Sequence, residues 1–142
     1  MLKVVLDTNL WLRILMGGAT VNFIASARAK RQLEIVSSEA LLAELDEVRQ
    51  RPKLRVRINE IEARELTESI RNCAIMTELH TTPPYCRDPK DNIVLATAID
   101  GGADVIVSSD GDLRDDEALQ AAMKEYGIEI WGIEQLRRVI NP

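Results

Sequence analysis

Short apolar runs alternate in this chain with segments of helical periodicity, and this alternation constrains the fold more than any other feature. Runs rich in Val, Ile and Leu, typical of buried strands, occupy residues 2–6, 33–36, 73–79, 103–108 and 128–131. Strands separated by helices form parallel sheets that are covered on both faces. The sequence therefore predicts a three-layer α/β/α fold with a central, mainly parallel sheet of four to five strands.

Glycines, prolines and capping residues mark where the intervening helices begin and end. Helices are predicted over residues 10–15, 20–31, 38–51, 58–72, 88–100, 115–126 and 133–140. Neither an internal repeat nor a low-complexity linker interrupts the 142 residues. We therefore expect a single domain over residues 1–142.

Several functional classes are excluded by composition. No apolar stretch approaches the roughly 20 residues of a membrane span, and residues 1–15 lack the pattern of a secretion signal. Cys73 and Cys86 are too few for a disulfide framework or a zinc site, and a lone His80 cannot complete a histidine-rich one. The expectation is a cytoplasmic protein without a membrane partner.

The net charge of −5 argues at first against a nucleic-acid partner. Bound Mg²⁺ would cancel part of that charge locally if several acids formed a metal site. Basic side chains are also clustered, at Arg28, Lys30 and Arg31 and at Arg49, Arg51, Lys53, Arg55 and Arg57. Such clusters either contact a phosphate backbone or form a solvated surface, and net charge alone does not decide between the two.

Acidic residues stand where strands end or helices begin. Asp7 directly follows the first apolar run, and Asp110 follows the run at residues 103–108. Asp91 falls in the first turn of its helix, and Glu44 in the second turn of another. Since ligands bind outside the carboxyl ends of parallel strands, these carboxylates are expected at one edge of the sheet. Their mutual repulsion favours a bound cation, and oxygen ligands suit Mg²⁺ or Mn²⁺.

Each acid also has a purely structural interpretation. Asp7 is suited to an Asx turn, Asp88 to a helix N-cap and Asp91 to a capping box. Asp110 is compatible with an ordinary turn, and Glu44 with a solvated helix surface. Independent turns and caps have no reason to converge on one sheet edge, so the combination favours a functional site.

In this order and spacing, four motifs resemble those of the PIN-domain nucleases over essentially the whole chain. The first is Val-Leu-Asp7-Thr8-Asn9, and the second is the helix at residues 38–48 with Glu44. The third is Asp88-Pro89-Lys90-Asp91-Asn92, and the fourth, at residues 107–113, contains Asp110 and Asp112. The third departs from the commonest toxin form because Asn92, not an apolar residue, follows Asp91.

The resemblance implies a Mg²⁺- or Mn²⁺-dependent endoribonuclease. Asp7, Glu44, Asp91 and Asp110 would be catalytic, with Asp7, Asp91, Asp110 and Asp112 as metal ligands. Substrate or supporting contacts would come from Thr8, Asn9, Asp88, Asn92 and Ser109. A VapC-like toxin role, a cognate antitoxin and a homodimer are further implications of the family; the departure in the third motif weakens any transfer of RNA specificity.

Two other interpretations stay open. A PIN fold that has lost catalysis would serve as an RNA- or protein-binding scaffold, although all four expected acids are present. A receiver domain of a signalling protein also gathers aspartates around Mg²⁺. It requires an acidic pair after the first strand and a lysine after the last, and this chain has neither.

Overall fold

The computed structural model describes residues 1–17, 19–81 and 89–141, with backbone only for residues 19–22, 89–90 and 112. Its described strands are β1 (Leu2–Leu6), β2 (Leu33–Ser37), β3 (Ile75–Met76), β4 (Val105–Val107) and β5 (Glu129–Trp131). They form one five-stranded sheet in the order β3-β2-β1-β4-β5, and every neighbouring pair is parallel. The predicted α/β/α architecture is thereby confirmed.

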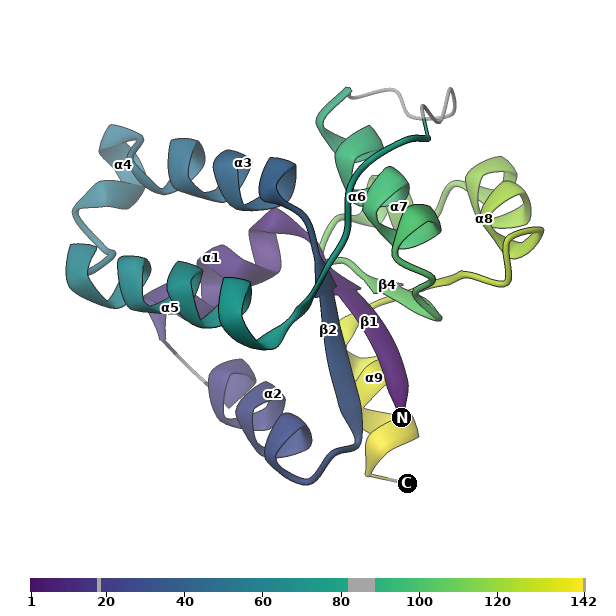
Figure 1. The fold of residues 1–142 in the computed structure, drawn as a ribbon, viewed down its shortest axis with the longest axis horizontal. Helices are drawn as coiled ribbons and strands as arrows, with labels where there is room; N and C mark the ends of the chain where they lie inside the picture. The colour runs from purple at the N-terminus through teal and green to yellow at the C-terminus, as the bar shows by residue number, and fades with distance from the viewer. Residues whose placement is uncertain (18, 82–88, 142) are drawn as a thin grey trace.

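Side-chain alternation along the strands divides the core into two layers. Val4 and Leu6 point into one layer, and Val5 points into the other. Helices α1 (Thr8–Met16), α2 (Ala19–Ala29), α3 (Glu39–Arg49), α4 (Pro52–Arg55), α5 (Glu60–Cys73) and α9 (Ile133–Ile140) pack on the Val4 side. Helices α6 (Pro89–Asp100), α7 (Gly111–Arg114) and α8 (Glu117–Lys124) cover the Val5 side, and Figure 1 shows the two groups separated by the sheet.

The helices α3 and α6 are tied together near their buried faces. Ser38 caps α3, since its hydroxyl accepts a hydrogen bond from the Leu41 N–H at 3.2 Å. The same hydroxyl is hydrogen-bonded to the Thr97 hydroxyl of α6 at 2.9 Å, and both side chains are buried. This contact sets the position of α3 relative to α6, and these two helices contain Glu44 and Asp91.

Some predicted boundaries were wrong. The third strand is not residues 73–79 but only Ile75–Met76, and exposed Cys73 is the last residue of α5. The helix predicted to begin at residue 115 begins at Glu117, and the short helices α4 and α7 were not predicted. Four-residue helices show too little periodicity to be distinguished from turns. Among the helices of the described ranges, none is long and apolar enough to span a membrane.

One member of the predicted basic cluster is a buried structural residue. The Arg49 side chain is only 6% exposed and forms ion pairs with Asp46 at 2.9 Å and with Glu60 at 2.5 Å. These contacts connect α3 to the start of α5, and hydrogen bonding from Arg49 holds the pKa of Glu60 below its usual range. Arg49 is therefore not available to contact a nucleic acid.

We expect Arg49→Met to lower the free energy of unfolding by about 1–3 kcal/mol, because it removes charged hydrogen bonds donated by a buried guanidinium group. Arg64→Met is the matched control, since Arg64 contacts the same Glu60 but is 76% exposed. Its effect should be much smaller. Urea unfolding at neutral pH compares the two variants, and equal losses would contradict a special role for Arg49.

Candidate acidic site

The candidate site lies where the direction of the strand order changes. From central β1 the chain builds β2 and β3 on one side and then β4 and β5 on the other. A ligand-binding crevice opens at such a switch point, outside the carboxyl ends of the two diverging strands. Asp7 follows β1, and the segment Ser108–Asp110 follows β4. The sheet topology therefore places these two acidic segments side by side.

Both carboxylate oxygens of Asp7 are held by hydrogen bonds. Its Oδ1 caps α1 by accepting from the Leu10 N–H at 2.9 Å. Its Oδ2 accepts from the Ser108 hydroxyl at 2.6 Å and from the Ser109 N–H at 3.2 Å. Asp7 is only 5% exposed. One side chain thus joins the end of β1, the start of α1 and the loop after β4.

Burial raises the pKa of Asp7, and the nearby charge of Asp110 raises it further. The hydrogen bonds from Ser108, Leu10 and Ser109 oppose this rise without cancelling it. A carboxyl whose pKa is raised by folding favours the folded state below its unfolded pKa and loses that contribution as pH rises through the folded value. Ionisation of Asp7 in the folded protein is therefore unfavourable, and a cation bound beside its carboxylate would offset that cost.

Four acids from four segments line one pocket. Asp7 and Asp110 lie at the strand ends, Glu44 projects from α3, and Asp91 from the first turn of α6. The cavity measures about 170 Å³. Its remaining lining residues are Thr8, Asn9, Val48, Arg51 and Val94. The structure thus brings together the four carboxylates that the sequence separates by up to 103 positions, from residue 7 to residue 110.

The other predicted site residues do not all belong to the part of the chain that the structure describes. Ser109 contacts Asp7 through its backbone N–H, and Asn92 lies in α6 with a buried Oδ1 that accepts no hydrogen bond from the described residues. Asp88 and the side chain of Asp112 lie outside the described residues, although the backbone of Asp112 belongs to α7.

The donor set fits a hard divalent cation. All four acids offer oxygen atoms, which Mg²⁺ and Mn²⁺ prefer. Within the described ranges, however, no three Asp, Glu, His or Cys side chains are grouped closely enough to hold one ion between them. A cation here would therefore keep part of its water shell, as Mg²⁺ commonly does when one or two carboxylates bind it.

Ser108 is a site residue that the sequence prediction missed. Its hydroxyl is fully buried, donates to Asp7 Oδ2 and accepts from the Asp110 N–H at 2.9 Å. It therefore fixes the two acids relative to each other. The sequence predicts a substrate or supporting contact for Ser109 and none for Ser108. The relevant signal is the strand register: Leu6 pairs with Val107, so Ser108 follows β4 at the position where Asp7 follows the neighbouring strand β1.

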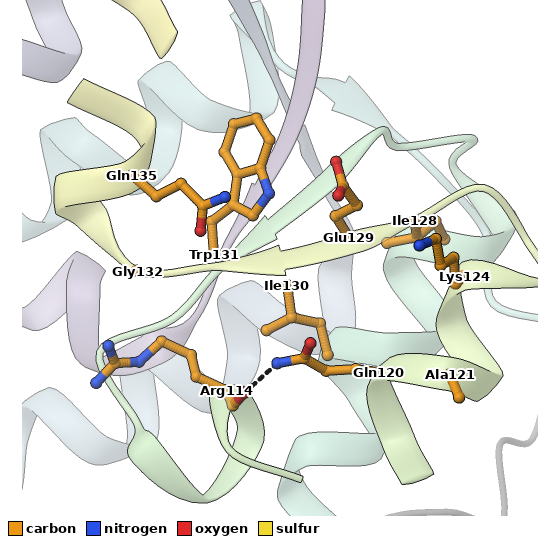
Figure 2. A pocket seen from close by; sticks show the side chains of 10 residues that line it. All are labelled: Arg114, Gln120, Ala121, Lys124, Ile128, Glu129, Ile130, Trp131, Gly132 and Gln135. Atoms are coloured by element: carbon orange, nitrogen blue, oxygen red, sulfur yellow. Dashed lines mark hydrogen bonds between the residues drawn. The ribbon is translucent and has the colours of Figure 1, made fainter. Parts of the chain in front are cut away.

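A second cavity, of about 470 Å³, lies along the outer edge of β5 and shares no residue with the acidic pocket. Figure 2 shows Arg114 and Gln120 on one side of β5, with Trp131 and Gln135 on the other. Among the described residues that line it, one is acidic, Glu129. Its described lining therefore differs from that of the acidic pocket, where four carboxylates meet.

Fold and site together define a three-layer α/β protein with an acidic pocket at the switch point of a parallel sheet. The family model of the PIN domain matches residues 3–112, which is more than half of the chain, so the protein belongs to the PIN-domain family. The matched range includes all four pocket acids. A comparison with curated proteins finds no match. PIN domains are generally nucleases that act on nucleic acids and typically use divalent metal ions.

We expect Ser108→Ala to lower the free energy of unfolding by about 1–3 kcal/mol, since it removes a buried hydroxyl that serves two polar partners. Ser109→Ala should have a much smaller effect, because the backbone N–H that contacts Asp7 remains. Urea unfolding in EDTA measures both variants without any contribution from bound metal. A Ser109→Ala loss as large as that of Ser108→Ala would contradict the assigned geometry.

Proposed function

We propose that this protein is a metal-dependent endoribonuclease that hydrolyses RNA phosphodiester bonds. The observation that supports it is the pocket at the switch point, where Asp7, Glu44, Asp91 and Asp110 converge from separate segments of a PIN domain. Its described lining contains carboxylate, hydroxyl and amide groups and one guanidinium group. The chemistry proposed here relies on the carboxylates and on the cation that they attract.

In this proposal Asp7, Asp91, Asp110 and Asp112 hold one or more Mg²⁺ or Mn²⁺ ions, directly or through water. Such a cation, when bound, lowers the pKa of a water molecule and offsets charge on the leaving oxygen. A carboxylate oxygen of Glu44 receives the proton of the water that attacks phosphorus. The hydrogen bonds to Asp7 keep its carboxylate oriented before substrate arrives.

The remaining predicted residues have supporting roles. Thr8 and Asn9 line the pocket and contact phosphate oxygens of the substrate. Ser109 orients the loop beside Asp110 through the hydrogen bond of its backbone to Asp7. Asn92 follows Asp91 on α6 and supports its position, and Asp88 precedes that helix in the same motif.

We further propose that the nuclease is the toxin of a toxin–antitoxin pair, acts in the cytoplasm, forms a homodimer and is inhibited by a cognate antitoxin. Membership of the PIN-domain family supports this role. A catalytically inactive scaffold and a receiver domain are the competing functions. Membership of the PIN family counts against the receiver, and the complete set of pocket acids counts against the inactive scaffold.

Cleavage of a mixed single-stranded RNA pool with Mg²⁺, Mn²⁺ or EDTA tests the nuclease. We expect cutting with metal, none with EDTA, and a fall to about a hundredth or less in Asp7→Asn and Asp110→Asn, as for the loss of one group that stabilises transition-state charge. The matched control is Asp116→Asn, because Asp116 also caps a helix, α8, but does not line the pocket.

Equal cutting by the wild type and both pocket variants would show a contaminant or a misplaced site. Folded protein that binds RNA with and without metal and never cuts it would favour the inactive scaffold. Phosphorylation by a small phosphodonor would favour the receiver domain.

Expression of the wild-type chain alone should slow growth of the host, because a nuclease without its inhibitor degrades cellular RNA. Asp7→Asn should relieve this effect at matched soluble expression. Growth curves after induction measure both, with Asp116→Asn as the control that should stay harmful. Unimpaired growth at high soluble expression of the wild type would contradict the toxin role. It would not contradict the proposed nuclease activity.

A further inference from the structure

A larger cavity, of about 630 Å³, adjoins the acidic pocket. The two cavities share Asn9, Val48, Arg51 and Asp110, so they form one continuous depression. We call the larger one the flanking groove; it extends from Asp110 over α1 to the junction of α3 and α4, and its other lining residues include Leu12, Arg13, Met16 and Leu54. Its size is that of a small-molecule site, which commonly occupies 300–1,000 Å³.

Two arginines from separate segments of the chain line the flanking groove. Arg13 lies on α1, is exposed and forms no ion pair within the described part of the chain. Arg51 lies just before α4 and pairs with Glu47 at 3.0 Å, but both partners are solvent-exposed, at 46% and 62%. Exposed ion pairs of this kind are weak and exchange readily for another anion. Both guanidinium groups are therefore available to contact phosphate, which their planar geometry matches.

The same groove also has an apolar part. Leu12 is buried, and Met16 and Leu54 are half-buried where they line it. Phosphate does not need apolar contacts, but an unpaired base gains from them. In a duplex the bases are stacked inside the helix and cannot reach such a surface. Cationic and apolar groups side by side therefore fit a single strand.

We propose that the flanking groove binds the nucleotide next to the scissile bond of a single-stranded nucleic acid. Arg13 and Arg51 contact its phosphates, and Leu12, Met16 and Leu54 contact its base. The inference rests on the proposed nuclease function, which places the scissile phosphate at the neighbouring acids. Two arginines beside the site would allow a chain of net charge −5 to bind phosphate there.

Binding, measured separately from cleavage, tests the groove. A labelled single-stranded RNA pool is titrated in EDTA with Asp7→Asn protein, or with Asp110→Asn if the first variant fails to fold. Adding Arg13→Ala or Arg51→Ala should weaken binding about 3- to 10-fold. A plot of the logarithm of the RNA association constant against the logarithm of the salt concentration has a negative slope. Each variant should reduce the magnitude of this slope by about 0.7, the value for one phosphate contact on a single strand. Thermal unfolding verifies that each variant is folded.

The matched controls are Arg55→Ala and Arg57→Ala, which remove exposed arginines close in sequence that do not line the groove. They should leave affinity and salt slope unchanged. A blunt RNA duplex of the same length should bind more weakly than the single strand, and its affinity should respond less to Arg13→Ala.

The outcomes separate this inference from the nuclease proposal. RNA binding that depends on Arg13 and Arg51 in a protein that never cuts RNA would support the groove and overturn the nuclease. Cleavage by the wild type together with unchanged binding in both arginine variants would support the nuclease and overturn the groove. Equal losses in the control variants, or duplex binding as tight as single-strand binding, would also overturn the groove.

Discussion

The Asp7 carboxylate is the interaction on which the arrangement of the site depends. It ends a central strand, caps the helix that follows and accepts two hydrogen bonds from the loop after β4. A buried carboxylate requires such partners, because an unpaired charge with little access to water is costly. The same hydrogen bonds that stabilise Asp7 bring the loop containing Asp110 beside it. Asp7 is therefore both the N-cap of α1 and a candidate metal ligand. The two interpretations of this side chain do not exclude each other.

Clustering acids at this edge has a cost that the fold does not remove. Burial and the charge of Asp110 together raise the pKa of Asp7 despite three opposing hydrogen bonds. Functional sites often keep such unfavourable electrostatics, because a bound cation or substrate then gains free energy by relieving them. The scaffold itself contains ion pairs of Arg49 with Asp46 and Glu60, and of Arg71 with Glu39. The raised pKa of buried Asp7, at the lining of the acidic pocket, supports a role for the pocket in binding a cation.

Much of this arrangement follows from sequence pattern, and some of it does not. The strand periodicity and the positions of Asp7, Glu44, Asp91 and Asp110 predict the sheet and the convergence of the acids, because parallel strands present their carboxyl ends at one edge. Strand β3 begins later than predicted because α5 continues through Cys73. Ser108 was not predicted, because its contact with Asp7 depends on the register between β1 and β4. Burial of Arg49 depends on α5, which begins eleven positions later in the sequence, and no local pattern predicts that contact.

Pro52 determines the backbone conformation of Arg51, which is one of the proposed substrate contacts. A residue before proline is driven out of the helical region, and Arg51 has an extended backbone with φ −63° and ψ 143°. The helix α3 therefore ends at Arg49, while Pro52 opens α4 at a position where its missing N–H costs nothing. Two arginines only two positions apart thus acquire opposite roles: Arg49 is buried against acids of α3 and α5, and Arg51 lines both the acidic pocket and the flanking groove. The backbone restriction imposed by Pro52 thus separates Arg49, which stabilises the fold, from Arg51, the proposed phosphate contact. A count of charges along the sequence does not distinguish these two arginines.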